Sequence, residues 1–462
     1  MNVIMQGDDR INKIIQRKKL SGEAEYRLSH YAYLFSESGR YLVRNTMTFE
    51  VTELTEREWN SILLIKKAPV RFDHLAENGL EQLAMKRYIV ETTFDEVKQY
   101  QQTVFILKTM AGGKKGLKSY IIFPTTGCNA RCVYCYEEGY AVKNMTAETA
   151  DRLVDFICET RRDDTVVLRW FGGEPLVRAD IIRRICTGLR ERGVPYRSNM
   201  VTNASLLTKE LAHEAKELWN LKTVQVSLDG AKADYTARKN YYAPEKNNYD
   251  VVMQAVHYLA DEDIKVNLRV NVDFDNISRI PDFLHEIKAE FGSMENIALY
   301  IAALFQVKHS GRCLELFDEI FRLTELQKEL GIPVNAHLDH KAVRMRTNYC
   351  MADAADRSVV ITPDGVFNNC EHLPEGHSWG NITDGVTDRA RYDELLAPPD
   401  IDEQCAKCPF LPECTPFYKK GCPGWFEKCR EYHCMKTEYA LRSLLKGANT
   451  EQNGEQYDDE EI

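Results

Sequence analysis

Between residues 120 and 305, strand-like apolar segments alternate six times with segments of helical periodicity. The apolar segments include YIIFPTT at 120–126, TVVLRWF at 165–171 and TVQVSLDG at 223–230. Helices are expected between the strands, over 146–162, 178–192, 208–219, 247–262 and 277–291. Strands that alternate with helices in this way form parallel sheets. The sequence therefore predicts an α/β fold, in which six parallel strands form an open sheet or a partial (β/α)6 barrel of the TIM type.

Polar sequence clusters follow four of these strands. A cysteine loop, TTGCNARCVYCYEEG, spans 125–139, and the later clusters are GGEP at 172–175, TNAS at 202–205 and SLDG at 227–230. In parallel α/β folds the carboxyl ends of the strands meet at one edge of the sheet, and active sites are found there. We therefore expect the four clusters to form one site.

The cysteine loop contains Cys128, Cys132 and Cys135 within eight residues. A structural zinc site needs four ligands, and no fourth cysteine or histidine lies near this loop in the sequence. A four-iron cluster takes one thiolate per iron, so three cysteines would leave one iron open, as a reactive site requires. The residues favour an iron–sulfur cluster, with structural zinc as the alternative.

The spacing C-x3-C-x2-C, with the aromatic Tyr134 before the third cysteine and a strand before the loop, resembles the radical S-adenosylmethionine (radical SAM) superfamily. The resemblance covers roughly residues 118–305 and implies a [4Fe–4S] cluster on Cys128, Cys132 and Cys135. It implies that S-adenosylmethionine (SAM) binds the open iron and is cleaved reductively. The products would be methionine and a 5′-deoxyadenosyl radical, which takes a hydrogen atom from the substrate. The protein would position groups and exclude water.

Further positions match cofactor-binding motifs of this family. In GGEP, two glycines would let the backbone approach a ligand closely, and Glu174 would accept hydrogen bonds from the ammonium group of SAM. Family members often have T-N-G where this chain has Asn203 followed by Ala204. Arg238 is either a carboxylate partner or an ordinary surface arginine. The cofactor-binding residues that the resemblance implies are Tyr134, Gly172, Gly173, Glu174, Asn203, Ser227, Asp229 and Arg238, and no residue is assigned a catalytic role.

Eight of the fourteen cysteines lie between residues 350 and 434. Cys350 and Cys370 flank TPDG, where Gly365 is expected to form a tight turn. C-x2-C-x5-C follows at Cys405, Cys408 and Cys414, and then come Cys422, Cys429 and Cys434. This order resembles the SPASM domain, which carries auxiliary clusters in some radical SAM enzymes. It departs from the family pattern after Cys414, because seven residues rather than three precede Cys422.

Eight cysteines equal two sets of four, the number that two [4Fe–4S] clusters need. By resemblance, an outer set of Cys405, Cys408, Cys414 and Cys434 holds one auxiliary cluster. Cys350, Cys370 and Cys422 hold an inner cluster, with Cys429 as a possible fourth ligand. Together with the first loop this gives three [4Fe–4S] clusters. Two zinc sites are the alternative.

Residues 25–92 are predicted to form a small domain of a few strands and about three helices. Thr55 and Glu58 have capping-box spacing before a helix whose Trp59, Ile62 and Leu63 share one face. This domain resembles the winged-helix-like element that grips leader peptides. The expected divisions are a mobile arm at 1–24, a winged-helix-like domain and linker at 25–110, a radical SAM partial barrel at 118–308, a linker helix region at 309–349, a SPASM domain at 350–445 and an acidic disordered tail at 446–462.

Radical SAM enzymes with SPASM domains mostly modify peptides and proteins. The long segment before Cys128 favours a maturase of ribosomally made peptides, most readily one that forms thioether crosslinks from cysteine. A leader-bearing precursor peptide and an electron donor such as ferredoxin or flavodoxin are the implied partners. The alternative functions are a maturase that forms carbon–carbon crosslinks, a sulfatase-type formylglycine maturase, a multi-cluster electron carrier and a binding module stabilised by zinc. The alternative for the N-terminal domain is a purely structural cap.

The net charge of −10 and the absence of a basic block predict no nucleic-acid partner. No run of 18 apolar residues exists, so no membrane span is expected. The polar start of the chain lacks the apolar centre of a secretory signal, and the cytoplasm is therefore the expected location. Disulfides are rare there, which is a further reason to assign the cysteines to metal.

Overall fold

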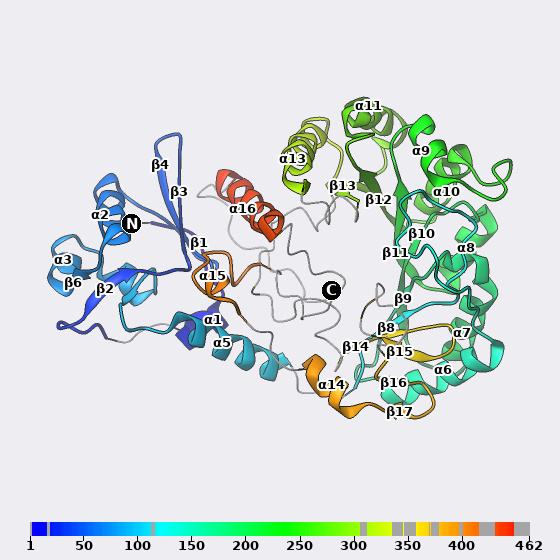
Figure 1. Cartoon of the computed structure of the whole chain (residues 1–462), viewed down its shortest axis with the longest axis horizontal. Helices are drawn as coiled ribbons and strands as arrows, with labels where there is room; N and C mark the ends of the chain where they lie inside the picture. The colour runs from blue at the N-terminus through cyan, green and yellow to red at the C-terminus, as the bar shows by residue number, and fades with distance from the viewer. Residues whose placement is uncertain are drawn as a thin grey trace.

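The computed structural model describes residues 2–15, 19–111, 116–304, 312–334, 345, 357–368, 370, 378–396, 401–414 and 430–447. Figure 1 shows an N-terminal unit on one side and a curved sheet with its helices on the other. The predicted ligands Cys350, Cys422 and Cys429 lie outside the described residues, as does most of the predicted tail.

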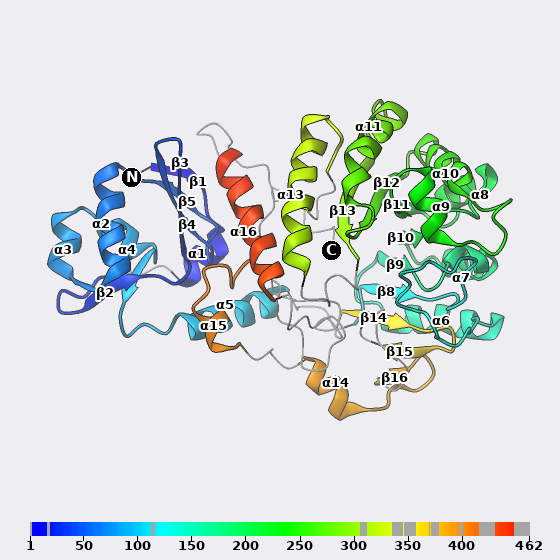
Figure 2. The ribbon, with the colours of Figure 1, turned by 45° about the horizontal axis from the view of Figure 1, so that its top comes forward.

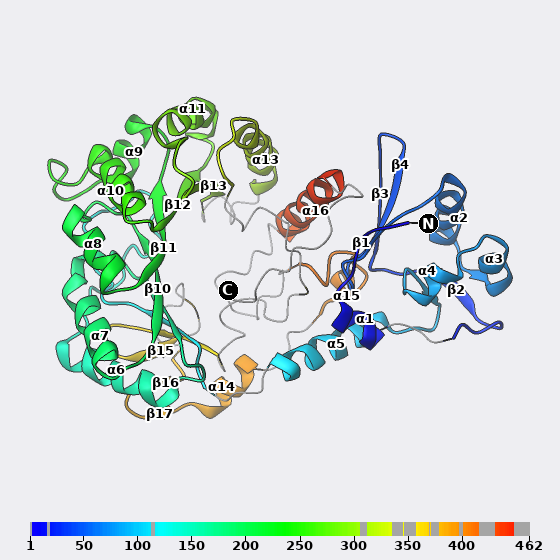
Figure 3. The same cartoon turned by 180° about the vertical axis from the view of Figure 1, so that it is seen from behind.

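The curved sheet contains the six predicted parallel strands, adjacent in space in their order along the chain. These strands are β8 (Ser119–Ile122), β9 (Val166–Trp170), β10 (Tyr196–Thr202), β11 (Leu221–Leu228), β12 (Lys265–Val272) and β13 (Ile297–Ala303). The helices on the outer face (Figure 3) are α6 (Ala147–Thr160), α7 (Ala179–Glu191), α8 (Lys209–Glu217), α10 (Tyr249–Asp261) and α11 (Ile280–Phe291). The α/β class and the parallel six-strand order are confirmed.

Alternation along the strands gives this sheet two different faces. On β11, the apolar Val224, Val226 and Leu228 are fully buried and pack into the core with the outer helices. The alternate residues, which are polar and half-buried, face the concave side; they include Thr223, Gln225 and Ser227 on β11 and Asn267 and Arg269 on β12. The outer face therefore supplies stability, and the concave face is left for polar chemistry.

The C-terminal part extends this sheet, which the sequence did not predict. β14 (Ser358–Ile361) pairs in parallel with β8, and antiparallel pairing adds β15 (Val366–Asn368), β16 (Gly380–Asn381) and β17 (Gly385–Val386). The predicted turn at Gly365 is confirmed, because its N–H donates to the Thr362 carbonyl at 2.9 Å and its φ is +78°. Part of the predicted SPASM domain is thus continuous with the barrel sheet.

The N-terminal unit has two small sheets and four short helices, the first of which is α1 (Asp9–Ile15). The first sheet has the order β1–β5–β4–β3, and the second has the order β6–β2–β7. Thr55 and Glu58 form the predicted capping box at the start of α2. The strands are β2 (Glu25–Leu28), β3 (Ala32–Glu37), β4 (Arg40–Asn45), β5 (Val51–Glu53), β6 (Val70–Arg71) and β7 (Ile89–Glu91), and the other helices are α2 (Glu56–Lys67), α3 (Phe72–Glu77) and α4 (Glu81–Met85). The winged-helix assignment stays a prediction.

Residues 2–15, within the expected mobile arm at 1–24, form regular secondary structure. They form β1 (Asn2–Met5), which pairs with β5, and α1 (Asp9–Ile15). Ile4, Ile11 and Ile15 are buried in this arrangement. The apolar side chains are few and widely spaced, so their burial depends on partners far along the chain that local patterning does not reveal. Helix α5 (Glu96–Ala111), which lies against α1, occupies the expected linker.

Helix α16 (Arg430–Gly447) joins the two halves of the molecule (Figure 2). On one side Tyr439 stacks on Phe321 of α13 (Cys313–Glu329), with ring centroids 4.0 Å apart. On the other side Leu441 and Leu445 pack with Tyr33, Phe35 and Leu42 of the first N-terminal sheet. The remaining described helices are α9 (Lys232–Lys239), α14 (Arg389–Leu396) and α15 (Glu403–Ala406). No helix in the described part of the chain is long and apolar enough to cross a membrane.

Candidate functional site

The cysteine loop leaves β8 and is held on one side by the backbone of the GGEP turn. The Glu174 N–H donates to the Gly127 carbonyl at 2.9 Å, and the Gly173 N–H donates to the Thr125 carbonyl at 3.2 Å. A Cβ on Gly172, whose φ is +113°, would lie 2.2 Å from the Thr125 oxygen, and one on Gly173 would lie 2.4 Å from the Gly127 oxygen. The two glycines are therefore required by the close approach of the cysteine loop itself.

This contact gives a steric prediction. Gly173→Ala should displace the start of the cysteine loop, because the new methyl group meets backbone oxygens that cannot rotate away. Overpacking lowers the free energy of unfolding by about 1–3 kcal/mol in ordinary cores, and we expect a loss at the upper end of this range for Gly173→Ala. The measurements are iron bound after anaerobic reconstitution and protease cleavage within 125–145. Gly22→Ala is the control, since a Cβ there meets nothing within 4 Å; equal iron content in both variants would contradict this role.

A second segment holds the loop from the opposite side. The Arg131 N–H donates to the Asn240 carbonyl at 2.9 Å, and the Val133 N–H donates to the Arg238 carbonyl at 3.0 Å. The Tyr242 N–H donates in turn to the Asn129 carbonyl at 3.1 Å. The cysteine loop thus lies between the GGEP turn and residues 238–242, which end α9 and follow SLDG. Two of the four predicted clusters, the cysteine loop and GGEP, thus meet through main-chain contacts.

Glu174, the third residue of the GGEP turn, is fully buried. Its carboxylate accepts hydrogen bonds from the Leu176 N–H at 3.0 Å, the Thr202 hydroxyl at 2.6 Å and the Asn203 N–H at 2.7 Å. Burial raises the pKa of Glu174, while these donors and Lys239 oppose the rise. A carboxylate offers about four lone-pair positions, so one remains for a further donor.

The TNAS cluster is tied to the loop through Asn203. Its side-chain amide donates to Asn129 Oδ1 at 2.9 Å and lies 3.9 Å from the Cys128 sulfur. Ala204 has φ of +58°, in the left-handed region that glycine adopts most easily. This backbone conformation accounts for the glycine that the resembling family often has at that position.

A buried polar network lies beneath Tyr134. The Tyr134 hydroxyl is 2.7 Å from both carboxylate oxygens of Asp229, and Lys239 Nζ donates to that hydroxyl at 3.0 Å. Asn271 Nδ2 donates to Asp229 Oδ1 at 3.1 Å. Asp229 is fully buried, and its carboxylate contacts Tyr134, Asn271 and Lys239. Lys239 and Asn271 were missed by sequence reasoning.

The other two predicted contacts are placed differently. Arg238 is buried, and its guanidinium donates two hydrogen bonds to the Asp273 carboxylate, at 3.1 and 2.7 Å. It is therefore not an ordinary surface arginine. Its guanidinium carbon lies 5.5 Å from the centre of the Tyr134 ring. Ser227 is half-buried on the concave face of β11, beside Arg269 on β12. The structure thus brings Tyr134, Gly172, Gly173, Glu174, Asn203, Asp229 and Arg238 around the cysteine loop.

Residues 122–287 match the Radical SAM superfamily, and this range contains the loop, GGEP, TNAS and SLDG. The chain contains a radical SAM domain. Members of this family are enzymes that use a [4Fe–4S] cluster and SAM. The three thiols of the loop fit such a cluster, since they lie on one loop, form no disulfide and are half-buried at the carboxyl edge of the sheet.

Individual proteins are also similar to this chain, in sequence or in structure. Fe-coproporphyrin III synthase of Methanosarcina barkeri is 26% identical over 211 residues, which cover 45% of this chain and 48% of that protein. The structure of anSMEcpe with bound AdoMet and Cp18Cys peptide has a TM-score of 0.58 at 16% identity, covering 72% of this chain and 99% of that one. Streptococcus suis SuiB bound to precursor peptide SuiA has a TM-score of 0.50 at 15% identity, covering 87% and 99%. The two structural likenesses show a shared fold.

Outside the radical SAM domain, the described cysteines of the outer set are neighbours. Burial, together with the nearby thiols of Cys408, Cys414 and Cys434, raises the pKa of Cys405 to about 12. Among the described residues, no three His, Cys, Asp or Glu side chains converge on a single metal ion. A four-iron cluster takes one thiolate from each of four cysteines, and the outer set contains four cysteines.

Cys370 is the one described cysteine of the inner set, and it lies near the cysteine loop. Burial raises the pKa of Tyr140, and Glu137, Cys370 and Cys135 add to this rise. Tyr140 is therefore within electrostatic reach of Cys135 in the cysteine loop and of Cys370 in the inner set. This places Cys370, the described member of the inner set, near the cysteine loop.

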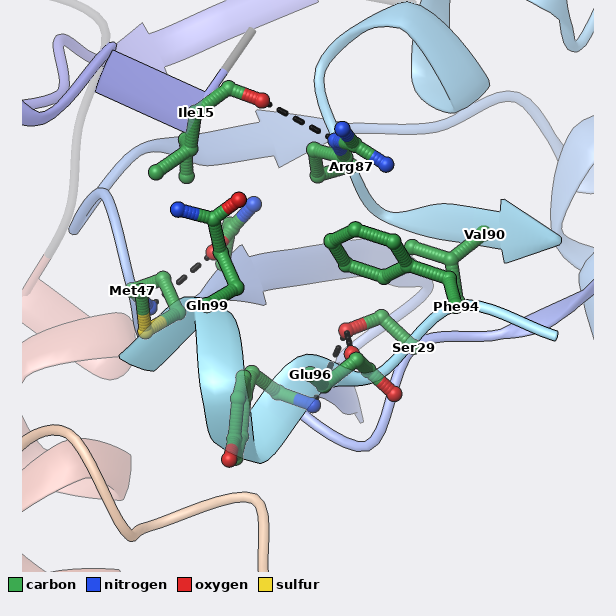
Figure 4. Close-up of a pocket in the computed structure, with 10 residues that line it drawn as sticks. Ile15, Ser29, Met47, Arg87, Val90, Phe94, Glu96 and Gln99 are labelled. Carbon is green, nitrogen blue, oxygen red and sulfur yellow. Dashed lines mark hydrogen bonds between the residues drawn. The ribbon is translucent and has the colours of Figure 1, made fainter. Parts of the chain in front are cut away.

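A small pocket in the N-terminal unit does not contribute to this site. Figure 4 shows Arg87 against Phe94 on one side and Glu96 beside Ser29 on the other. Arg87 donates to the Ile15 carbonyl at 2.9 Å, and Glu96 accepts from Arg27 at 2.6 Å and from the His30 N–H at 3.1 Å. The charged groups of the pocket are thus engaged in holding α1, the strands and α5 together.

Proposed function

We propose that the chain is a radical SAM enzyme that cleaves SAM reductively and oxidatively modifies a ribosomally made peptide, with thioether crosslinks from cysteine as the product. The observation that carries this proposal is the placement of the cysteine loop. Its thiols lie at the carboxyl edge of a sheet whose concave face is polar, and main-chain contacts fix the loop on both sides. The bound cluster and SAM would supply the one-electron chemistry that starts hydrogen abstraction.

The protein's own groups would position these cofactors. Cys128, Cys132 and Cys135 would hold the cluster, and the remaining lone-pair position of Glu174 would accept the SAM ammonium group. Asp229 would act through Tyr134, whose hydroxyl it fixes. Ser227 and Asn203 would contact SAM from the concave face and the loop. The GGEP backbone would exclude water from the first turn of the loop by close packing.

Two observations support a peptide substrate. anSMEcpe and SuiB, which share the fold, were solved with peptides bound. In this chain, β1 and β3 are the edge strands of the first N-terminal sheet, and an edge strand can pair with an added peptide strand through main-chain hydrogen bonds. We propose that a leader peptide binds there, and that the outer and inner cysteine sets hold two auxiliary clusters that take up the electron left on the substrate.

The test uses the full-length chain, since its N-terminal sheet also covers the outer cysteine set. Anaerobic protein, reduced by flavodoxin or dithionite, is mixed with SAM and with peptides encoded beside its gene. Mass spectrometry should find peptides that have lost two hydrogen atoms per crosslink, one from the cysteine thiol and one from the acceptor carbon, and peptides with the sulfur-donating cysteine replaced by alanine should stay unmodified. Hydrogen exchange should show peptide-dependent protection in β1 or β3.

Other products would overturn the crosslinking proposal in recognisable ways. Loss of sulfur from a cysteine would indicate formylglycine formation, and crosslinking that keeps a free thiol would indicate a carbon–carbon bond. Because a relative named Fe-coproporphyrin III synthase aligns over 211 residues, the formation of iron coproporphyrin III from a tetrapyrrole precursor is assayed as a second activity. Its formation, with every peptide unchanged, would replace the peptide proposal. Absence of 5′-deoxyadenosine under all conditions would indicate electron transfer alone.

A further inference from the structure

Lys239 is a buried cation beside the cysteine loop. It is the last residue of α9 and is only 3% exposed. Its Nζ donates to the Tyr134 hydroxyl at 3.0 Å and lies 3.7 Å from Asp229 Oδ2. It also lies 5.6 Å from the centre of the Tyr134 ring and 5.7 Å from that of Tyr235. Because burying an ammonium group is costly unless it is compensated, this position requires an explanation.

The neighbouring charges show why the ammonium group is retained. Burial opposes the charge of Lys239, but Asp229, Tyr134 and the Cys132 thiol raise its pKa well above the ordinary value. The main chain places Lys239 beside the cysteine loop, because the Val133 N–H donates to the carbonyl of the preceding residue, Arg238, at 3.0 Å. The other nearby cation, Arg238, is neutralised by its two-bond contact with Asp273. Lys239 also has a carboxylate neighbour, since Asp229 Oδ2 lies 3.7 Å from its Nζ, so the field at the cysteine loop is set by these two opposite charges together.

A fixed positive charge affects a cluster more in its reduced state than in its oxidised state. The added electron increases the negative charge of the cluster, and Coulomb attraction to a nearby cation is strong where water is excluded. The reduction potentials of iron–sulfur clusters depend on net charge, hydrogen bonding and solvent exposure. Through Tyr134, the same lysine also restrains the residue that precedes Cys135.

We infer that Lys239 is a positioning residue that holds Tyr134 against Asp229 and places a fixed positive charge beside Cys132, so that the cluster accepts an electron more readily. The electron comes from an external low-potential one-electron donor, and the cluster is reduced by one electron with no proton transferred to Lys239. This inference rests on the proposal that Cys128, Cys132 and Cys135 hold a [4Fe–4S] cluster.

The test is a redox titration of the reconstituted full chain without SAM, followed by electron paramagnetic resonance. The signal of this cluster is identified as the one missing from the Cys128→Ala/Cys132→Ala/Cys135→Ala variant. Lys239→Met should shift its midpoint potential to a more negative value, and Lys239→Arg should restore most of the wild-type value because it keeps the charge. Asp229→Asn, which removes the opposing negative charge, should shift the potential in the positive direction.

Two outcomes would overturn the inference. The first is an unchanged potential in a folded Lys239→Met protein. The second is an equal shift in Lys239→Met and Lys239→Arg, which would show that packing matters and charge does not. If the Lys239→Met protein does not fold, the midpoint potential of Asp229→Asn tests the inference instead. An unchanged or more negative potential in Asp229→Asn would contradict the inference. If Cys128, Cys132 and Cys135 hold no cluster, the result is distinguishable from both of these outcomes. The wild-type and triple-cysteine proteins would then have identical paramagnetic resonance signals and iron contents.

Discussion

Replacing Cys128, Cys132 and Cys135 together by alanine is expected to remove about four of roughly twelve irons per chain, by the stoichiometry of one thiolate per iron in three clusters. Formation of 5′-deoxyadenosine should be abolished, because no open iron remains to bind SAM. Iron analysis and chromatography of the SAM products measure both effects. Cys158→Ala is the control, since Cys158 packs against the barrel core away from the loop. SAM cleavage that persists in the triple variant would refute the radical mechanism.

Replacing Arg44 by methionine is expected to loosen the contact between the N-terminal unit and the outer cysteine set. Arg44 Nε lies 2.8 Å from Glu413 Oε1, and the two side chains are 1% and 2% exposed. Removal of one partner leaves a buried charge without compensation, which costs about 3–5 kcal/mol. Because Glu413 precedes Cys414, the amount of iron bound by the outer set should decrease together with the free energy of unfolding. Native-state hydrogen exchange in β4 and 401–414, together with iron analysis, measures the result.

Two control variants separate the charge from the packing. In Arg44→Met/Glu413→Leu both charges are gone, and such replacements of a buried pair are often neutral or stabilising, so most of the protection and iron should return. Arg389→Met breaks an ion pair of the same 2.8 Å length whose side chains are 74% and 54% exposed, and it should change little. Equal protection in Arg44→Met and Arg389→Met would show that the buried pair does not hold the two parts together.

The barrel strands could be predicted because their pattern is local. Each apolar segment of β8 to β13 is bounded by polar motifs, and each outer helix has its own periodicity. Pairing of β14 with β8 joins residues more than 230 positions apart, for example Ser358 and Ser119, and no local pattern contains that information. The same holds for Arg44 and Glu413, which are 369 positions apart.

The candidate site divides in the same way. The cysteine loop, GGEP and SLDG could be found because their spacing is short and specific. Helix α9 was not predicted, because eight mainly polar residues carry little periodic signal, and Lys239 was missed with it. The glycines of GGEP were expected to admit a ligand, whereas the structure shows the cysteine-loop backbone against them. Motifs identify which residues matter, and only the fold shows what each one touches.

The position of α16 has a consequence for how the molecule is made. Tyr33 near the start of the chain contacts Glu438, 405 residues later. Synthesis proceeds from the N-terminus, so the surface of Tyr33, Phe35 and Leu42 that packs against α16 stays exposed until α16 has left the ribosome. Closing so distant a contact is slow, and apolar surface exposed meanwhile favours aggregation. If Cys434 on α16 is a ligand of the outer cysteine set, as we propose, that set can be completed only after translation has passed residue 434.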